Sequence, residues 1–206
     1  MSNKKHTTTI ANNARGQGLI ESIVAITIIT VGLSSILGLV IAGVAGEQIA
    51  SSQIVAANLS REGIEVVRNI RDTNWMNGAA WDAGLDSGIP AADLTAVVQY
   101  NTGSSTLDFN PDPNCEAVGA VYPCRLYLGS GTNSGLYSHT ATGQPLNYWR
   151  LIKMYRICRD ETIDKGEDSG SHCNSKIGIQ IISEVYWQEH GRSHTIAAED
   201  RIYNWR

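Results

Sequence analysis

A stretch without charge sets the strongest limit on how this chain can fold. From Ser22 to Gly46 the sequence contains no Asp, Glu, Lys or Arg. As a helix, such a run is long enough to cross the hydrocarbon core of a bilayer, which takes about 20 apolar residues. Glu21 stands immediately before the run, where an ionisable group is costly to bury and marks a functional hypothesis. The sequence therefore predicts a transmembrane segment over about residues 22–46.

The composition limits what else the chain can be. With 206 residues it can hold one domain in addition to an anchor. A hydrophobic content of 42% together with a net charge of only −4 argues against wholesale disorder. The folded part carries no basic block, so charge alone does not indicate a nucleic-acid partner.

The first sixteen residues differ from an ordinary secretory signal. They are polar, carry Lys4, Lys5 and Arg15, and have no apolar core of their own. A secretory signal places its apolar region before the cleavage site, whereas the candidate processing site here, after Gly16, precedes the apolar run. Cleavage would therefore leave the hydrophobic segment attached, and the basic residues would hold the leader in the cytoplasm with the C-terminus outside.

The order of these residues resembles the type IV prepilin signature: a basic leader, Gly16, Gln17 as the new first residue, Glu21 and then the apolar run. The resemblance implies that a prepilin peptidase cuts after Gly16 and methylates the amino terminus of Gln17. The family most often has phenylalanine where this chain has Gln17. The resemblance also implies two surroundings for the helix, which are the inner membrane before assembly and other pilin subunits in a helical filament afterwards.

Glu21 has two interpretations. In the first, the free amino terminus of a neighbouring chain neutralises this carboxylate as helices stack, which favours an axial stagger between subunits and offsets the cost of a charge in lipid. In the second, Glu21 is an ordinary residue at the start of a helix, near the membrane interface, favoured there by the helix dipole.

The apolar pattern continues beyond the membrane segment. No proline occurs between Gln17 and Ile89, and apolar residues recur at a spacing of three or four, which is typical of one helix face. This apolar stripe comprises Ile49, Val55, Ala56, Leu59, Gly63, Val66, Val67 and Ile70. The opposite face carries Glu47, Gln48, Asn58, Arg61, Glu65 and Arg68. The pattern predicts one long helix over residues 17–74, following the leader over residues 1–16.

Residues 75–206 form the predicted head domain, which is rich in turns and short strands. Five segments have strand character: 96–100, 125–128, 135–139, 148–157 and 177–188. Thr195 to Tyr203 returns as the second arm of a hairpin after a tight connection over residues 189–192. The sequence thus predicts an α+β fold, in which the long N-terminal helix packs on an antiparallel β-sheet.

This arrangement is similar to the pilin head. The final residues, from Tyr203 to Arg206, resemble the ending of minor pilins, and the segments 61–68 and 71–75 are similar to pilin-like proteins from environmental bacteria.

The four cysteines, Cys115, Cys124, Cys158 and Cys173, all lie in the head and allow three pairings. Neighbours in sequence are the simplest pairs, and such loops stabilise by about 2–3 kcal/mol in the chain-entropy model. Disulfides persist outside the cytosol, in agreement with an exported head. A zinc site made of the four thiolates is the alternative, but the spacing contains no C-x2-C pair.

Catalytic motifs are missing from the sequence. It has no HExxH pair, no GxSxG elbow and no phosphate-binding Gly-Lys loop, so we expect no enzyme activity, no catalytic residue and no cofactor. Acidic residues between Asp160 and Asp168 are interrupted by Lys165, which favours a solvated loop over a calcium site. Trp75 and Trp81 are expected to pack under the end of the helix, with surface or carbohydrate binding as the alternative.

Taken together, the residues and the resemblance lead us to expect a structural subunit, a minor pilin of a type IV pilus. It would lie in the cytoplasmic membrane before assembly and in a surface pilus after it, with the head available for contact or adhesion. The alternatives are a pseudopilin of a type II secretion or DNA-uptake machine, and an unprocessed membrane-anchored binding domain.

Overall fold

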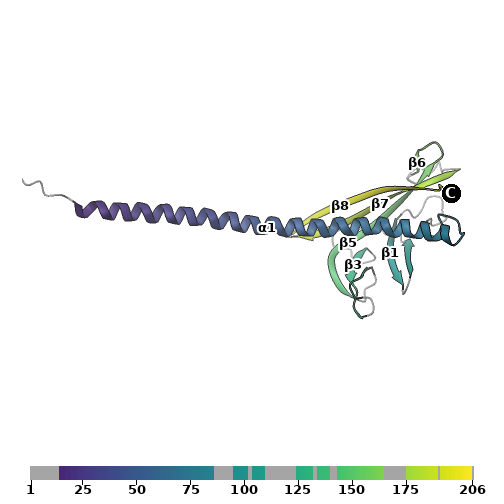
Figure 1. Cartoon of the computed structure of the whole chain (residues 1–206), viewed down its shortest axis with the longest axis horizontal. Coiled ribbons are helices and arrows are strands. Elements are labelled where there is room, and N and C mark those ends of the chain that lie inside the picture. The colour runs from purple at the N-terminus through teal and green to yellow at the C-terminus, as the bar shows by residue number, and fades with distance from the viewer. Residues whose placement is uncertain are drawn as a thin grey trace, which may run out of the picture. The chain divides into compact units, whose positions relative to one another are not determined.

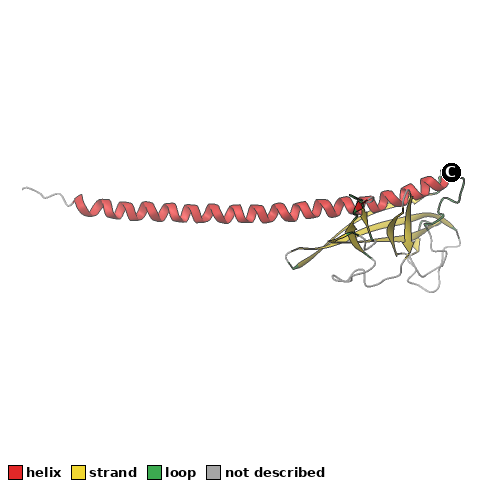
Figure 2. Cartoon of the chain, turned by 90° about the horizontal axis from the view of Figure 1, so that it is seen from below, coloured by secondary structure: helices red, strands yellow, loops and turns green. Residues whose placement is uncertain are grey.

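The computed structural model describes residues 14–85, 95–101, 104–109, 124–131, 134–139, 143–164, 175–189 and 191–205. The chain divides into two compact units, residues 1–49 and residues 50–206. Each unit is treated by itself below. Figure 1 shows the elements in chain order, and Figure 2 distinguishes helix from strand.

One helix, α1, runs from Ala14 to Met76 and confirms the long helix expected from the apolar periodicity. It continues to Met76 rather than ending at residue 74, so Trp75 belongs to its last turn. The turn that follows is closed by backbone bonds, including one from Ala79 N to the Asn74 carbonyl at 2.9 Å. Gly78 adopts a φ of 69° there, in the left-handed region that glycine tolerates at helix ends.

Eight antiparallel strands form the sheet of the second unit. They are β1 (Thr95–Asn101), β2 (Ser104–Phe109), β3 (Arg125–Leu128), β4 (Tyr137–Ser138), β5 (Gln144–Cys158), β6 (Ile163–Asp164), β7 (Lys176–Glu189) and β8 (Arg192–Tyr203). The long strand β5 is central, because β7 pairs with it along one edge and β3, β1 and β6 pair with it at successive places along the other. β8 then pairs with β7 through a hairpin.

The part of α1 from Ala50 onward packs on this sheet, as predicted for an α+β fold (Figure 2). Its buried face contributes Ala56, Leu59, Ile64 and Val67, which pack in two clusters with residues of the central strands. The sheet supplies apolar partners from β5, β7 and β8, among them Ile152, Ile179, Ile181, Val185 and Ile202. This face forms the main core of the unit, and large apolar side chains buried in such a core each contribute about 1.5–3 kcal/mol.

The other face of the sheet carries a smaller cluster around Trp149, with Val97, Cys124 and Leu151 buried and Tyr186 beside them. Trp149 and Leu151 alternate with Arg150 and Ile152, so successive residues of β5 serve opposite faces, as the period of a strand requires. Both faces of β5 are therefore covered in its middle, from Trp149 to Ile152.

The strand expectations hold for β1, β3, β5, β7 and β8. The pair β1–β2 was expected to be a single weak strand in a loop region, but residues 104–109 form a second arm. The reason is that the segment is short, contains Asp108, which is depleted in strands, and lies between turn-forming residues at 101–103 and 110–114. Along α1, Ile49 is exposed and Ile70 is half-buried, whereas Ser60 and Ile64 are buried.

Candidate functional site

The first unit of the chain presents a continuous apolar surface along α1. Every large hydrophobic side chain between Leu19 and Val44 is exposed, from 51% for Val24 to 74% for Leu39. Within the described residues, α1 is the one helix that is long and apolar enough to cross a membrane, with a mean hydropathy of 2.5 in its most apolar window. Exposed apolar surface on this scale requires lipid or protein cover. The helix is thus consistent with a membrane anchor.

The hydroxyl groups inside this segment are satisfied by the helix itself. Ser22, Thr27 and Ser34 each donate to a backbone carbonyl four residues earlier, at 2.8, 2.7 and 2.8 Å. Ser35 donates in the same way to the Val31 carbonyl, and Thr30 donates to the Thr27 carbonyl three residues earlier, both at 2.9 Å. Back-bonding of this kind is the usual way for Ser and Thr to enter a lipid-facing helix.

Small residues are spread through the same segment. Gly32, Gly38, Gly43 and Gly46 have no atom within 4 Å of where a Cβ would stand. Bare positions of this type let the backbone of another helix approach closely. The segment therefore has both the apolar surface and the gaps that helix association uses.

The predicted processing and assembly residues lie at the start of α1. Gly16 and Gln17 are within the helix, and the Gln17 side chain is outside the described part of the structure. Glu21 lies one turn further on and is exposed, and no described residue makes an ion pair with it. The structure thus places the three residues within two turns of helix, while processing and assembly stay predictions.

In the second unit, polar contacts fix the helix on the sheet. The Ser60 hydroxyl donates to the Ser183 carbonyl at 2.6 Å, and both residues are fully buried. At Gly63, a Cβ would collide with the Ser183 side chain, so a bare glycine lets the two backbones come close. Neither contact was predicted, because the sequence shows Gly63 only as a small residue of the apolar stripe and Ser60 only as a polar residue outside it.

Arg150 is buried under the helix and carries a charge into the core. Its Nη1 lies 3.2 Å from the Glu62 carboxylate and donates to the Leu59 carbonyl at 3.2 Å. Its Nε and Nη2 have no hydrogen-bond partner among the described residues. A buried guanidinium with only part of its donors paired carries a desolvation cost that Glu62 offsets. No pattern around Arg150 in the sequence indicated this role.

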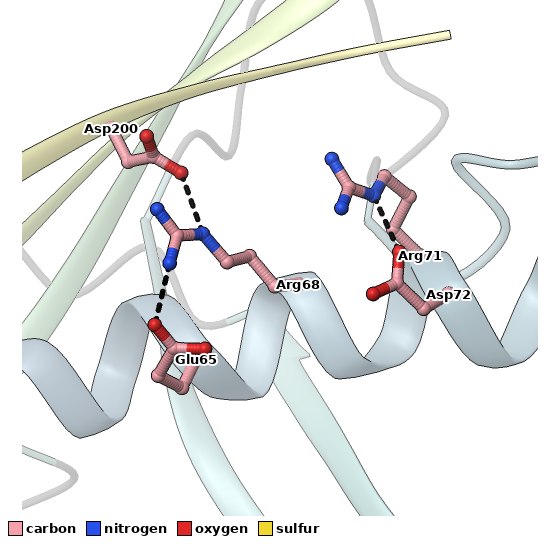
Figure 3. A network of polar contacts seen from close by, with 5 residues as sticks. All are labelled: Glu65, Arg68, Arg71, Asp72 and Asp200. Carbon is pink, nitrogen blue, oxygen red and sulfur yellow. Dashed lines mark hydrogen bonds and ion pairs between the residues drawn. The ribbon is translucent and has the colours of Figure 1, made fainter. Parts of the chain in front are cut away.

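A second set of charges joins the far part of the helix to β8 (Figure 3). Arg68 donates through Nε to Asp200 at 2.9 Å and through Nη1 to Glu65 at 2.5 Å. The pKa of Arg68 is raised above its usual value, chiefly by the hydrogen bond to Asp200, against the opposing effect of burial. Arg71 pairs with its neighbour Asp72 at 2.8 Å. These pairs are partly exposed, so each contributes little to stability.

The aromatic residues at the helix end pack as expected. Trp75 meets Trp205 with ring centroids 4.6 Å apart in an edge-on arrangement, and the Arg71 guanidinium lies 4.7 Å from the Trp75 ring. Trp81 packs against the main core, and Lys176 lies 5.6 Å from its ring. Asn74 holds the connecting turn by donating to the carbonyls of Trp81 and Ala83.

The remaining predicted sites divide between described and undescribed residues. Cys124 and Cys158 are both disulfide-bonded, and the described residues include no free cysteine. Cys115 and Cys173 lie outside the described residues, so their pairing stays a prediction. In the acidic loop, Asp160 accepts bonds from Thr162, which lowers the pKa of its carboxyl. Residues 165–168 are outside the described part of the chain. Among the described residues, no three His, Cys, Asp or Glu side chains are grouped so that they could bind a metal ion.

Comparison with protein families, curated proteins and solved structures finds no match for the chain. The class that the structure itself defines is an α+β protein with one long N-terminal apolar helix packed on an antiparallel sheet. Within that class, the anchor-like first unit and the separately cored second unit are the features from which a function can be proposed.

Proposed function

We propose that the chain is a type IV pilin-like subunit, of the minor pilin kind, which assembles into a filament through its N-terminal helix. The observation that carries the proposal is the exposed apolar surface from Leu19 to Val44 on a helix whose later part is committed to a folded head. Lipid before assembly and the helices of other subunits afterwards are two surroundings that suit the same surface.

The leader adds the second support. Gly16, Gln17 and Glu21 follow one another in the order of a prepilin signature, immediately before the apolar run. In the proposal, a peptidase on the cytoplasmic side removes residues 1–16, and the new amino terminus of one subunit pairs with Glu21 of another. An unpaired carboxylate in lipid is unfavourable, so the pairing draws a subunit toward the growing filament.

Processing is tested by mass spectrometry of the membrane-bound protein from cells that contain a prepilin peptidase. The mature chain is expected to begin at Gln17, with or without one added methyl group. Gly16→Leu should keep the leader, and Gly18→Leu, which alters a glycine two residues away, should not. A mature chain beginning elsewhere, or equal processing of both variants, would contradict the proposal.

Assembly is tested with Glu21→Ala. This variant should still insert in the membrane, because the apolar run is intact, but should be lost from filaments sheared off the cell surface. Glu47→Ala is the matched control, since Glu47 is an exposed glutamate of the same helix beyond the apolar run. Normal incorporation of Glu21→Ala would rule out the pairing.

The same experiment separates the alternatives. A pseudopilin shares the signal but stays in a short structure beneath the surface, so it would be absent from sheared filaments while still processed after Gly16. An unprocessed anchor would retain its leader in the membrane fraction. Recovery of the processed chain in sheared filaments distinguishes the proposed subunit from both.

A further inference from the structure

The last strand of the sheet leaves one of its edges open. β8 pairs with β7 over its whole length, and no described residue pairs with its other edge. Figure 1 shows β8, in yellow, as the outermost strand beyond β7. An edge strand carries a row of unpaired N–H and C=O groups, which can pair with the backbone of another chain.

The hairpin determines which backbone groups of β8 point outward. Glu189 and Arg192 close a two-residue connection, so they form a hydrogen-bonded pair, and every second residue from Arg192 onward bonds to β7. The residues between them direct their N–H and C=O groups away from the sheet. All of these outward residues are exposed: Ser193, Thr195, Ala197, Glu199 and Arg201.

The sequence of β8 lacks the usual protection of an edge strand. Proteins protect such edges with short strands, bulges, proline and charged residues, lysine above all. β8 is twelve residues long, keeps a continuous register with β7 and contains no Pro, Gly or Lys. Its charged residues lie toward its ends, at Arg192 and over 199–201, and residues 193–198 include no Asp, Glu, Lys or Arg. A long, regular edge of this kind suits the addition of an extended peptide as a further strand.

Exposed aromatic residues continue this edge at the end of β8. Tyr203, the last residue of the strand, is 39% exposed, and Trp205 is 67% exposed. Tyr and Trp are enriched where proteins bind one another and often carry much of the binding energy. A partner strand therefore meets open backbone groups first and an apolar, aromatic contact at one end.

A second copy of β8 does not suit this edge. Ala56 of α1 shares a cluster with Ile196 of β8. Val67, further along α1, shares the next cluster with Ile202, so α1 and β8 run in the same direction. Antiparallel pairing of β8 with another β8 would thus reverse one α1 relative to the other, whereas chains anchored in one membrane enter it in the same direction. This step rests on the anchor in the proposed function, and it favours a strand from a different polypeptide.

We propose that the open edge of β8 binds an extended segment of another polypeptide, which pairs antiparallel with residues 193–203. Antiparallel pairing is the more stable of the two strand orientations. Opposite charges stabilise cross-strand pairs, so the partner carries a basic residue opposite Glu199 and an acidic residue opposite Arg201. Its side chains are uncharged opposite 193–198 and apolar opposite Tyr203.

The test uses the full chain in detergent and a synthetic peptide of this pattern, LVETKVTVTVT, whose Leu lies opposite Tyr203 and whose last Thr lies opposite Ser193. Fluorescence anisotropy of the labelled peptide measures binding. A control peptide with Glu and Lys exchanged should bind about fivefold more weakly, because two favourable cross-strand pairs become unfavourable. A second control, N-methylated at the two Thr residues opposite Thr195 and Ala197, should not bind, since it keeps the side chains but cannot donate to β8.

Hydrogen exchange followed by NMR locates the peptide. The outward amides of Ser193, Thr195 and Ala197 should become protected when the peptide binds. The amides of the alternate residues, which already bond to β7, should change little. Protection confined to other parts of the chain would contradict the proposal.

Ala197→Pro tests the edge from the side of the protein. It removes one outward N–H and leaves the bonds to β7 in place, as proline at an edge position does, so binding should weaken by about tenfold. Ala197→Ser is the matched control, because it keeps the N–H, and should bind like the parent chain. If Ala197→Pro does not fold, the N-methylated peptide still tests the same hydrogen bonds.

Three results would overturn the proposal. One is that the peptide does not bind, and another is that the N-methylated peptide binds equally well. The third is self-association of the full chain that Ala197→Pro abolishes, which would make a second copy the occupant. The test needs neither cleavage after Gly16 nor a filament, so its failure can be distinguished from failure of the proposed function.

Discussion

Several single residues of this protein make contacts that the sequence pattern does not predict. Arg150 is the strongest case, since a fully buried guanidinium rests on one carboxylate and one helix carbonyl. The geometry makes the two members of the pair unequal. Removing Glu62 leaves a charge in the core, whereas removing Arg150 leaves a carboxylate that is one-third exposed and can be hydrated.

Glu62→Ala is therefore expected to destabilise the head by about 3 kcal/mol, as breaking a buried pair does. Arg150→Met should cost less, because no charge stays buried. Denaturant unfolding of the two variants in the same detergent measures the difference. The explanation is wrong if Arg150→Met is the more destabilised variant.

Tyr148 gives a prediction of pH dependence. Its folded-state pKa is raised, first by burial and also by Glu189. The neutral phenol is thus favoured by folding. Its contribution to stability is complete below the unfolded pKa of about 10 and is lost as the pH rises through the higher folded value.

The stability of the parent chain should accordingly fall more steeply with rising pH above about 10 than that of Tyr148→Phe. Tyr203→Phe, which alters an exposed tyrosine of β8, serves as the control and should follow the parent chain. Chemical unfolding at a series of alkaline pH values gives the slopes. Identical slopes for the parent and Tyr148→Phe would contradict the assignment.

At the level of elements, the approach of α1 to the sheet depends on a bare position in the helix. Gly63→Val should destabilise the head by about 1–3 kcal/mol, the usual cost of overpacking a core, because its side chain meets Ser183 and Ile152. Gly43→Val is the control, since nothing lies within 4 Å of a Cβ there. Thermal unfolding of both variants measures the difference. Equal midpoints would contradict the prediction, because they would show that Ser183 and Ile152 move aside without cost.

Much of this element could be predicted from the sequence. The spacing of Ala56, Leu59, Val66 and Val67 indicated the buried face, and strong alternation indicated β7 and β8. The burial of Ser60 and Ile64 was not predicted, because the helix face that is buried against the sheet is wider than the apolar stripe. β2 was not predicted as a strand, because its pairing with β1, rather than its own strand propensity, makes it one.

Some of the candidate sites could be predicted from the sequence and others could not. Glu21 and the apolar run are local features and could be located from the sequence. The buried pair of Arg150 and Glu62 could not, because its members belong to β5 and α1 and lie far apart in the chain. Arg150 is simply a basic residue on a strand until the helix is placed against it.

At the level of the whole molecule, the two units differ in what they need in order to stay folded in solution. Residues 50–206 contain the clusters around Ile152, Val185 and Trp149, and the main polar contacts of the head. A chain beginning at Ala50 should therefore stay in solution without detergent and unfold cooperatively. Size-exclusion chromatography and circular dichroism during heating test this, with the full chain as the comparison. Aggregation of the shortened chain, or a gradual melt, would show that the head needs the first unit.

The back-bonded hydroxyls of α1 have a consequence for exchange between environments. Each Ser and Thr hydroxyl described there donates its hydrogen bond to a backbone carbonyl of the same helix. None therefore needs a new partner when the surroundings of the helix change. Transfer of the segment from acyl chains to a bundle of similar helices then breaks no side-chain hydrogen bond from these residues. In the proposed assembly, Glu21 is the principal polar group that distinguishes the two surroundings. Under that proposal, insertion is governed by the apolar run and departure from the bilayer by a single carboxylate.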